Sequence, residues 1–435
     1  MMTKNGKSVH SQIQKRTIQN LRKVLFVNSR INSTLEVEKL LTIIVHTAAE
    51  VMQSKAASLM LIDEKTQDLV FQVALGPSGS QLKEHFRVKM GEGIAGRVAE
   101  SGKSAVVKNV KKTKQFARRF DEATGFVTKS ILCVPVKSKD KTIGVLEAIN
   151  PIRREGFGSL DQDLFETFAN QAGIAIENAR YHEEILKQER AKQELKIAHQ
   201  IQQNFLPDLK KVSFGIDLAA VSIPAREVGG DFYDVIPLGD ARYVIAIGDV
   251  SGKGVPASLY MVRAISELRF LAPHQRSISG LMKALNEALV QNTSFGMFVT
   301  LLVMILDRKK RTLEFSSAGH HPILKRNSHT STVESVGCGK GGVPVGLDEG
   351  AVYEEESIPI EAGDVFILYT DGIIEARNTK GEEFTLERLT KTATSHSQDA
   401  QGYANAILQS VQDFTKDAEQ HDDMTALALV IPDAP

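Results

Sequence analysis

Cysteine is scarce in this sequence, whose 435 residues include only Cys133 and Cys338. Two thiols so far apart predict neither a disulfide framework nor a cysteine-based zinc site, so both are expected to be reduced. No arginine follows either cysteine at close range. This excludes the anion-binding loop that a cysteine-dependent phosphatase needs next to its nucleophile.

Long apolar runs are also absent. No stretch approaches the roughly 18 residues that cross a bilayer, which excludes an integral membrane protein. Residues 1–30 carry basic side chains and no acidic one, but no apolar core of a signal peptide follows them. We therefore expect a soluble, cytoplasmic protein that begins with a basic, solvated segment.

The chain as a whole has no net charge, because 53 Lys and Arg balance 53 Asp and Glu. Its two parts differ: Asp and Glu outnumber Lys and Arg by 31 to 21 in residues 207–435, and Lys and Arg outnumber Asp and Glu by 32 to 22 before them. A surface that binds a phosphate backbone needs positive charge, so the acidic part is not expected to bind nucleic acid. Its acidity suits a divalent cation.

The length predicts two or three domains, since a domain typically has ~150 residues. In residues 31–180, Ser33 and Glu36 form a capping-box pair before an apolar helical face at 40–52. Short apolar runs that indicate strands follow at 57–62, 69–74, 86–90, 104–107, 131–136 and 143–149. Helices combined with antiparallel strands predict an α+β domain.

A long helical pattern without proline runs from Leu160 to Phe205, and Pro207 ends it. Its middle, residues 188–194, is almost wholly polar, so an apolar heptad seam fails there. Two interpretations stay open for residues 181–206: a marginal coiled coil that a ligand can shift, and a solvated spacer between two domains. Beyond it, apolar runs at 243–247, 298–306 and 365–369 predict strands, and 256–271 and 278–290 predict helices.

Glycine-rich segments suggest nucleotide binding but do not support it. The segment Gly91–Gly96 matches the dinucleotide pattern GxGxxG, yet a helix and an antiparallel hairpin precede it, so a tight strand-to-helix turn is the better interpretation. Lys253 and Lys340 follow glycines but are themselves followed by glycine, not by the Ser or Thr that would hold magnesium. Neither segment is predicted to be a P-loop.

Carboxylates stand beside turns next to four of the apolar runs: Asp231, Asp249, Asp371 and the pair Asp422–Asp423. Any one of them alone is best explained as a turn residue. Together at one edge they would repel one another unless a hard divalent cation neutralised them, and oxygen ligands favour Mg²⁺ or Mn²⁺. Two such ions can activate water for in-line attack on phosphate esters, so phosphoester hydrolysis is the predicted reaction class.

The motifs VGGDFYD, GDVSGKGVPAS, SAGHHP, YTDG and DDMTALAL resemble, in order and rough spacing, those of the PPM protein phosphatases, and most closely the SpoIIE/RsbU-like bacterial branch. The resemblance covers about residues 205–433. It implies an α/β/β/α sandwich with two Mn²⁺ or Mg²⁺ ions at one end. It also implies direct attack of metal-activated water on phosphoserine or phosphothreonine, with no covalent enzyme intermediate.

The same resemblance assigns the ligands. Asp249 would bridge both ions, helped by the carbonyl of Val250. Asp231 and Asp422 would lie on one ion and Asp371 on the other. Because Asp423 stands where many relatives have Asn, the choice between Asp422 and Asp423 stays open.

Five further residues lie in or near these motifs. Arg226, five positions before Asp231, is a candidate for binding the substrate phosphate, although an exposed surface Arg is an alternative. His320 and His321 are interpreted as structural support, because the carboxylates suffice as ligands. Ser251 and Lys253 are expected to shape their loop and not to attack the substrate.

Residues 31–180 resemble a GAF domain through GEGIAGRVAESG and ILCVPVKSKDKTIGVLEAIN. The resemblance implies a pocket for a cyclic nucleotide, a small metabolite, a chromophore or no ligand. For Cys133, a buried core thiol is favoured over cofactor attachment.

The sequence thus predicts an α+β protein of four parts: a basic segment 1–30, a GAF sensor 31–180, a helical linker 181–206 and a PPM phosphatase 207–435. By resemblance only, it would act on a phosphorylated STAS-type anti-sigma-factor antagonist and form a homodimer through the linker, with an unidentified small molecule or protein as its input. A non-catalytic GAF-dimer scaffold that binds a phosphoprotein is the alternative. A nucleotide cyclase or phosphodiesterase output is not supported, because no GGDEF or HD pattern is present.

Overall fold

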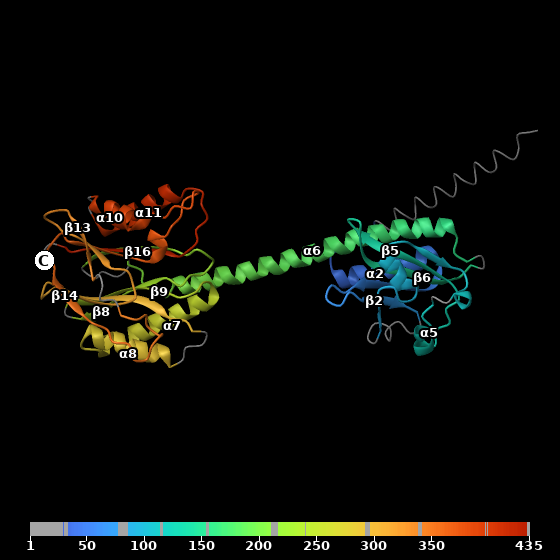
Figure 1. Ribbon diagram of the computed structural model, residues 1–435, viewed down its shortest axis with the longest axis horizontal. Coiled ribbons are helices and arrows are strands. Elements are labelled where there is room, and N and C mark those ends of the chain that lie inside the picture. Colours follow the sequence, from blue (N-terminus) through green and yellow to red (C-terminus); the bar gives the residue numbers. More distant parts are fainter. Residues whose placement is uncertain are drawn as a thin grey trace, which may run out of the picture. The chain divides into compact units, whose positions relative to one another are not determined.

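The computed structural model describes Ser29 and residues 34–432, except 77–85, 114–115, 154–155, 210–215, 240, 292–295, 338–341, 396 and 398. Most of the predicted basic segment 1–30, Ser33 and Cys338 lie outside the described residues. The chain forms two compact units, Met1–Arg190 and Ala191–Pro435, called here the N-terminal and the C-terminal unit (Figure 1).

The N-terminal unit is built on a six-stranded antiparallel sheet of strand order β3-β2-β1-β6-β5-β4. Its strands are β1 Ser54–Ile62, β2 Leu69–Leu75, β3 Arg87–Val88, β4 Ala105–Val107, β5 Ile131–Ser138 and β6 Lys141–Pro151. Its helices are α2 Val37–Met52, α4 Gly93–Ser101 and α5 Arg119–Thr124, with a 3₁₀ turn η1 Val110–Lys112. Every predicted strand is confirmed within a few residues.

The two faces of this sheet carry separate cores. On one face, the buried side of α2 and the first part of α6 (Ser159–Gln203) pack against alternate residues such as Leu59 and Leu146. On the other face, α4 packs against residues such as Met60 and Val145. The side-chain alternation of a strand explains this division. The predicted capping box is wrong, because Glu36 is the residue before α2 and not a member of its first turn.

The turn before α4 confirms the structural interpretation of the GxGxxG segment. Gly91 and Gly93 have φ angles of +79° and +66°, and a Cβ on Gly96 would stand 2.3 Å from the Lys89 carbonyl oxygen. Only glycine fits such an approach of two backbones. The preceding strands are antiparallel, so no dinucleotide-binding βαβ unit is present in this part of the chain.

Helix α6 is continuous over 45 residues, close to the predicted Leu160–Phe205. It begins in the N-terminal unit and ends in the C-terminal unit (Figure 1). Several large apolar side chains on it are exposed, among them Ile174, Tyr181, Ile185 and Ile197. Its middle lacks a buried face, which agrees with the polar composition there.

The C-terminal unit stacks two antiparallel sheets, of strand orders β14-β11-β10-β9-β8 and β13-β12-β15-β16-β7. The first sheet consists of β8 Phe232–Gly239, β9 Arg242–Val250, β10 Val299–Asp307, β11 Thr312–Ala318 and β14 Glu356–Pro359. The second consists of β7 Asp217–Ile223, β12 Ile323–Arg326, β13 Val333–Val336, β15 Val365–Tyr369 and β16 Met424–Val430. Side chains from both sheets, such as Ile247 and Leu427, share one core between them.

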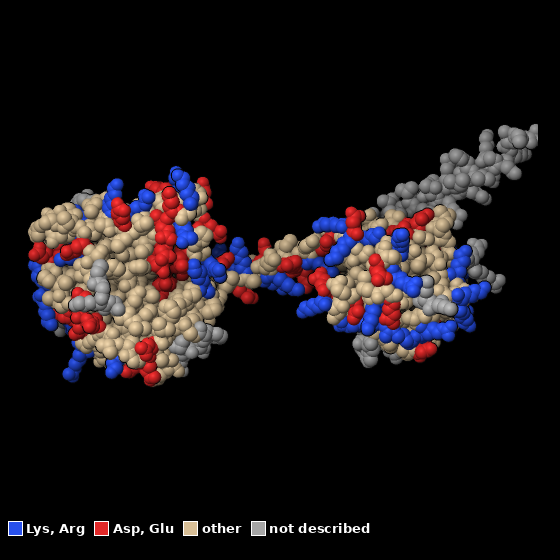
Figure 2. All heavy atoms as spheres, in the orientation of Figure 1, with Lys and Arg blue, Asp and Glu red and all other residues tan. Residues whose placement is uncertain are grey.

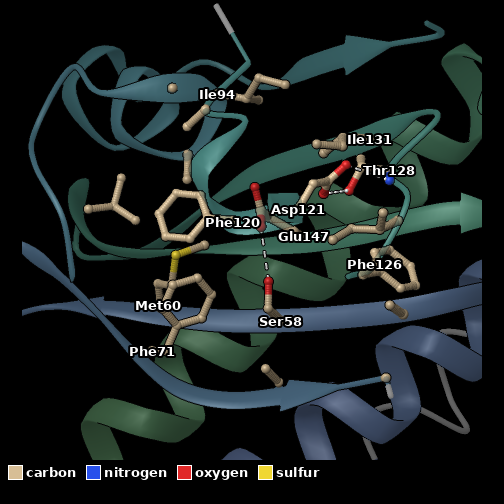
Figure 3. Close-up of a pocket in the computed structure, with 18 of the residues that line it drawn as sticks. Ser58, Met60, Phe71, Ile94, Phe120, Asp121, Phe126, Thr128, Ile131 and Glu147 are labelled. Carbon is tan, nitrogen blue, oxygen red and sulfur yellow. Dashed lines mark hydrogen bonds between the residues drawn. The ribbon is translucent and has the colours of Figure 1, made fainter. Parts of the chain in front are cut away.

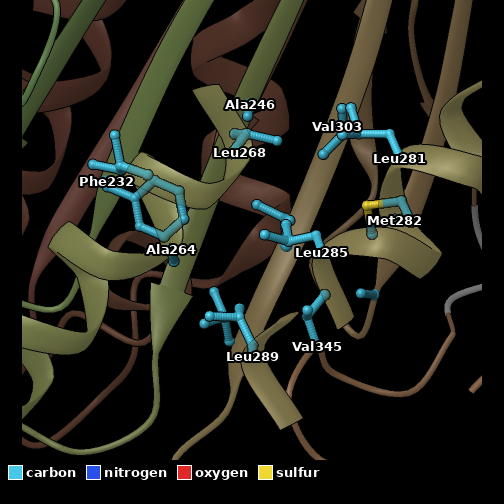
Figure 4. Close-up of a cluster of buried hydrophobic side chains, with 14 of the residues drawn as sticks. Phe232, Ala246, Ala264, Leu268, Leu281, Met282, Leu285, Leu289, Val303 and Val345 are labelled. Atoms are coloured by element: carbon cyan, nitrogen blue, oxygen red, sulfur yellow. The ribbon is translucent and has the colours of Figure 1, made fainter. Parts of the chain in front are cut away.

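Helices cover both outer faces. Helices α7 Val255–Leu271 and α8 Ile278–Val290, joined by the 3₁₀ turn η2 Ala272–His274, bury an apolar cluster against the first sheet (Figure 4). The N-cap Ser277 accepts a hydrogen bond from Gly280 N, and Pro256 stands in the first turn of α7, as expected for these helix starts. Helices α10 Thr385–Thr394 and α11 Ala400–Thr415 cover the second sheet, and the short helix α9 Asp371–Ile374 follows β15. This arrangement is the predicted α/β/β/α sandwich.

Candidate metal centre

Strand pairing brings Asp231 and Asp249 together at one end of the first sheet. Phe232, the first residue of β8, pairs with Gly248 near the end of β9. Adjacent antiparallel strands run in opposite directions, so the start of one lies beside the end of the other. Asp231 immediately precedes Phe232, and Asp249 immediately follows Gly248.

The second sheet supplies the other carboxylates in the same way. Tyr369 at the end of β15 pairs with Ala426 in β16, so Asp371 and the pair Asp422–Asp423 lie at one end of this sheet. The ends of the two sheets meet there, because the Thr370 hydroxyl donates a hydrogen bond of 2.7 Å to Asp231 Oδ2. On the face shown in Figure 2, acidic side chains of the C-terminal unit gather in a band.

Of the two carboxylates at the end of the first sheet, Asp231 is buried and Asp249 is partly buried, and both are close to other negative charges. Burial, followed by the charge of Asp249, raises the pKa of Asp231 well above its usual value. Burial, followed by the charges of Asp371 and Asp422, raises the pKa of Asp249 to about 7. Asp231 is 6% exposed, and its Oδ1 has no hydrogen-bond partner. A buried acceptor left in this state costs free energy that a bound cation would recover.

Asp371 shares this environment from the opposite sheet. Burial and then the charge of Asp422 raise its pKa, whereas the backbone N–H of Gly372 and the charges of His321 and Lys253 act in the opposite direction. Burial and the neighbouring carboxylate together outweigh these favourable contacts.

The adjacent residues Asp422 and Asp423 have different environments. Asp423 Oδ1 accepts a hydrogen bond from Ala225 N at 2.7 Å, and its Oδ2 accepts one from Gly230 N at 2.6 Å. Both of its oxygen atoms therefore fasten the loop that carries Asp231. Asp422 instead forms an ion pair of 2.9 Å with Lys253 Nζ and is about two-fifths exposed.

Close backbone approaches fix the positions of these loops. A Cβ on Gly229 would stand 2.4 Å from Asp423 Oδ2, and one on Gly372 would stand 2.0 Å from the Asp423 carbonyl oxygen. A Cβ on Gly230 would stand 2.9 Å from the carbonyl oxygen of Val250, the predicted backbone ligand. Side chains at these glycines would push the carboxylates apart.

The predicted phosphate-binding residue lies at the edge of the centre. Arg226 is exposed, and its guanidinium comes within 3.9 Å of a Cβ position built on Gly254, in the loop after Asp249. No hydrogen bond or ion pair to a described residue fixes it. Its charge is therefore available near the carboxylates.

The histidines and the serine of the motifs contact neighbouring residues of the sandwich. His320 Nδ1 lies 3.0 Å from Thr300 Oγ1, and burial lowers its pKa to about 3. The ring of His321 stacks on Tyr369 with a centroid distance of 5.4 Å. Ser251 Oγ accepts a hydrogen bond from Phe298 N at 2.9 Å.

A metal ion fits the chemistry of this donor set. As the side chains are placed, no three His, Cys, Asp or Glu residues of the described ranges stand close enough together to hold an ion. The excess of carboxylates and the unpartnered Asp231 oxygen nevertheless match what a hard divalent cation requires.

Three residues of the centre have roles that the sequence did not reveal. Thr370 orients Asp231 through its hydroxyl group. Because Thr370 lies within the YTDG motif, the sequence could have indicated this role. Lys253 was expected only to shape its loop but also pairs with Asp422 and donates to the His421 carbonyl oxygen at 2.5 Å. Gln202, at the end of α6, donates a 2.6 Å hydrogen bond to the Gly229 carbonyl oxygen, and no local pattern marks it.

Comparison with known proteins agrees with the two units. Residues 239–432 match the family described as Stage II sporulation protein E (SpoIIE), and residues 34–177 match the GAF domain. The chain thus joins a GAF domain to a SpoIIE-type phosphatase domain of the PPM family, and it is a protein serine/threonine phosphatase by its domain composition.

Individual relatives match parts of the chain. The chain is 29% identical over 285 residues to "Phosphoserine phosphatase RsbU" of Bacillus subtilis (strain 168), covering 64% of this chain and 83% of the relative. It is 31% identical over 269 residues to "Protein IcfG" of Synechocystis sp. (strain ATCC 27184 / PCC 6803 / Kazusa), covering 54% of this chain and 41% of the relative. The solved SiaA-PP2C domain of Pseudomonas aeruginosa shares the fold, with a TM-score of 0.51, 24% identity and coverage of 56% of this chain and 98% of that one.

Within the described part of the chain, no helix combines the length and the apolar character that a membrane span requires.

Proposed function

We propose that this protein is a metal-dependent phosphatase that removes phosphate from phosphoserine or phosphothreonine of a signalling protein under the control of its GAF domain. One observation carries the proposal: both sheets of the sandwich direct their carboxylates to the same end, where Thr370 links them through Asp231. Two Mn²⁺ or Mg²⁺ ions bound there would polarise the phosphoryl oxygens and lower the pKa of water.

The proposed ligands are the carboxylates whose two oxygen atoms are not both held by backbone N–H groups. Asp249, Asp231 and Asp371 repel one another, which supports their role as ligands. Because both oxygen atoms of Asp423 bind backbone N–H groups, we assign Asp422 as the ligand and Asp423 as the residue that holds the loop. The Val250 carbonyl keeps its proposed place beside Asp249.

The substrate phosphate is proposed to bind Arg226. A guanidinium presents paired N–H donors that suit two phosphate oxygens, and this one is exposed and without a fixed partner. An open pocket of about 240 Å³ borders Asp422 and is lined by residues that include Glu375 and Arg377. It offers room for the peptide around the phosphorylated residue.

Control by the GAF domain would act through α6. Gln202 in its last turn is buried, donates to the Gly229 carbonyl oxygen and accepts from Gly229 N at 3.3 Å. Gly229 stands two residues before Asp231. A shift of the helix end would therefore move a metal ligand by a short covalent path.

The partners are proposed from the likeness to RsbU. A STAS-type anti-sigma-factor antagonist in its phosphorylated form is the proposed substrate, and partner switching the proposed context. The exposed apolar residues Ile174, Tyr181 and Ile185 of α6 are spaced by seven and four positions and share one helix face, so a second helix could cover them, which supports a homodimer through the linker. The cytoplasmic location stays a prediction.

Manganese-dependent hydrolysis of p-nitrophenyl phosphate tests the central claim. Asp249→Asn should abolish the hydrolysis that added Mn²⁺ stimulates. The control Asp417→Asn, which changes an exposed carboxylate outside the centre, should leave Mn²⁺-stimulated hydrolysis unchanged. If the wild-type protein gave no response to Mn²⁺ or Mg²⁺, the non-catalytic scaffold would replace the proposed enzyme.

A further inference from the structure

The N-terminal unit contains a cavity of about 100 Å³ between its sheet and the segment from α4 to the start of β5 (Figure 3). An apolar cavity of about 150 Å³ is large enough to take up a benzene molecule. The space has about two thirds of that volume, so it admits a single ring only in a close fit and is too small for a whole nucleotide.

The lining is mainly apolar and rich in aromatic rings. Phe71, Phe120 and Phe126 contribute their rings, and Met60, Val88 and Ile94 add aliphatic surface. In Figure 3 the three labelled phenylalanines surround the Glu147 side chain. Rings of this kind favour a flat ligand and attract a positive charge that approaches their faces.

All charged side chains of the lining are acidic. They are Glu92, Asp121 and Glu147, and no Lys, Arg or His occurs among the described residues that line the cavity. Two of these three carboxylates already have partners within the protein. Glu92 Oε1 pairs with Arg119 at 2.9 Å, and Asp121 accepts hydrogen bonds from the backbone and hydroxyl of Thr128 at 2.8 and 2.6 Å.

Glu147 is the carboxyl that lacks a cation. In the middle of β6 it pairs with Ser58 of β1 and Cys133 of β5, so the three side chains lie in one row across the sheet. It is 8% exposed, and Ser58 Oγ donates a 3.0 Å hydrogen bond to its Oε2. The Cys133 thiol is its other neighbour. Both partners are neutral, and a carboxylate offers about four acceptor positions.

We propose that this cavity binds a small aromatic amine whose positively charged nitrogen donates to Glu147, and not a ligand that carries phosphate. A buried carboxylate is stabilised strongly by a hydrogen-bonded cation, which the protein itself does not supply here. Burial raises the pKa of Glu147, as expected of a carboxyl that still lacks this partner.

The N-terminus of α4 would favour binding of an anion in the cavity, but Glu92 lies at this end of the helix. Gly93 and Ile94 at the start of α4 contribute to the lining, and the N-terminus of a helix attracts negative charge. The Glu92 carboxylate stands at this end, however, where Lys89 N donates to its Oε2. A ligand phosphate would meet the Glu92–Arg119 ion pair and not a free helix N-terminus.

This inference names a ligand class for the proposed sensor domain. It rests on the proposed function only where it implies that ligand binding changes phosphatase activity. Binding itself can be measured on the full chain without phosphatase activity. A failure of the binding test would leave the metal centre unaffected, and an inactive metal centre would leave the binding test valid.

Four probes that share one ring separate the possibilities: benzylamine, benzyl alcohol, toluene and benzoate. Their affinities for the full-length protein are measured by ligand-observed NMR, with cyclic AMP and cyclic GMP as phosphate-bearing competitors. We expect benzylamine to bind roughly tenfold or more tightly than toluene, benzyl alcohol to rank between them and benzoate not to bind. The cyclic nucleotides should not displace benzylamine.

Variants of the protein then test whether Glu147 is the group that binds the ligand's positive charge. Glu147→Gln keeps the shape of the side chain and should weaken benzylamine roughly tenfold or more while leaving toluene unchanged. The control Glu122→Gln, on an exposed residue outside the lining, should change neither. The proposal is overturned if benzoate or a cyclic nucleotide binds as tightly as benzylamine, if no probe binds, or if Glu147→Gln leaves benzylamine unchanged. The ranking on wild-type protein decides the matter even where the variant does not fold.

Discussion

At the scale of single residues, the centre depends on which partner each carboxylate has. The oxygen atoms of Asp423 accept hydrogen bonds from Ala225 N and Gly230 N. Among the described residues, Asp422 pairs with Lys253 Nζ and accepts a hydrogen bond from Asp423 N. Two chemically identical side chains, adjacent in sequence, are thereby given different tasks. Substitution by Asn separates the tasks, because the amide keeps one acceptor oxygen and removes the charge.

Asp422→Asn is expected to raise the Mn²⁺ concentration needed for half-maximal hydrolysis of p-nitrophenyl phosphate, with little loss of stability. Asp423→Asn is expected to cost about 1 kcal/mol of unfolding free energy, because one backbone N–H loses its partner. Its effect on the Mn²⁺ requirement should be the smaller of the two. Metal titrations and urea unfolding of both variants provide the measurements, and the reverse ranking would contradict the assignment.

The titration of Asp249 predicts how the metal-free protein responds to pH. Folding raises its pKa from 3.8 to about 7, so between these values the folded state binds more protons than the unfolded state. Its contribution to stability therefore falls as pH rises from about 4 to about 7. Asn does not titrate.

In EDTA, the stability of Asp249→Asn relative to wild type should consequently increase across that pH range. Melting temperatures of both proteins at several pH values check this. A constant difference between them would show that the Asp249 carboxyl is not perturbed by its neighbours.

At the scale of elements, the C-terminal end of α6 contacts the loop that carries Asp231. The last turn is fixed by Gln202 and by Arg269, whose guanidinium donates to the Phe205 carbonyl oxygen at 2.6 Å and pairs with buried Asp234 at 2.7 Å. The end of the helix is therefore held to the sandwich by polar contacts with defined geometry.

Gln202→Ala is expected to lower the affinity for Mn²⁺ and the rate of p-nitrophenyl phosphate hydrolysis several-fold, because Gly229 loses its side-chain partner on α6. Gln200→Ala, an exposed position on the same turn, is the matched control and should behave as wild type. Calorimetric Mn²⁺ titration separates metal binding from turnover. Equal values for the two variants would remove Gln202 from the proposed route of control.

At the scale of the whole molecule, two compact units share one helix, and the apolar residues of its exposed middle are not covered by either. Each inserted residue rotates the following helix by about 100°. Insertions of one to four residues near Gln193 should therefore change phosphatase activity in a phase-dependent way. Mn²⁺ binding, measured by calorimetry, should persist throughout. Equal activity across the series would refute control through the helix and favour the solvated spacer.

The sequence alone determined much of this protein. The long proline-free pattern of residues 160–205 fixed α6 to within a few residues, and the five motifs fixed the sandwich and the acidic centre. Such features are local: a helix follows from its own periodicity, and a hard-cation site follows from the types of its ligands. Helices α10 and α11 were not predicted, because no distinctive pattern was recognised there, and the capping box was wrong because the chain enters α2 later than expected.

Only the tertiary structure decided how distant residues divide the work. The hydrogen bonds from Ala225 N and Gly230 N to Asp423 join positions nearly two hundred residues apart, and Gln202 meets Gly229 only because α6 docks on the sandwich. Glu147 likewise becomes a buried carboxyl without a cation only when β1 and β5 flank β6. The physical reason is the same in each case: hydrogen bonding and burial depend on neighbours in space, and the sequence specifies those neighbours only through the complete fold.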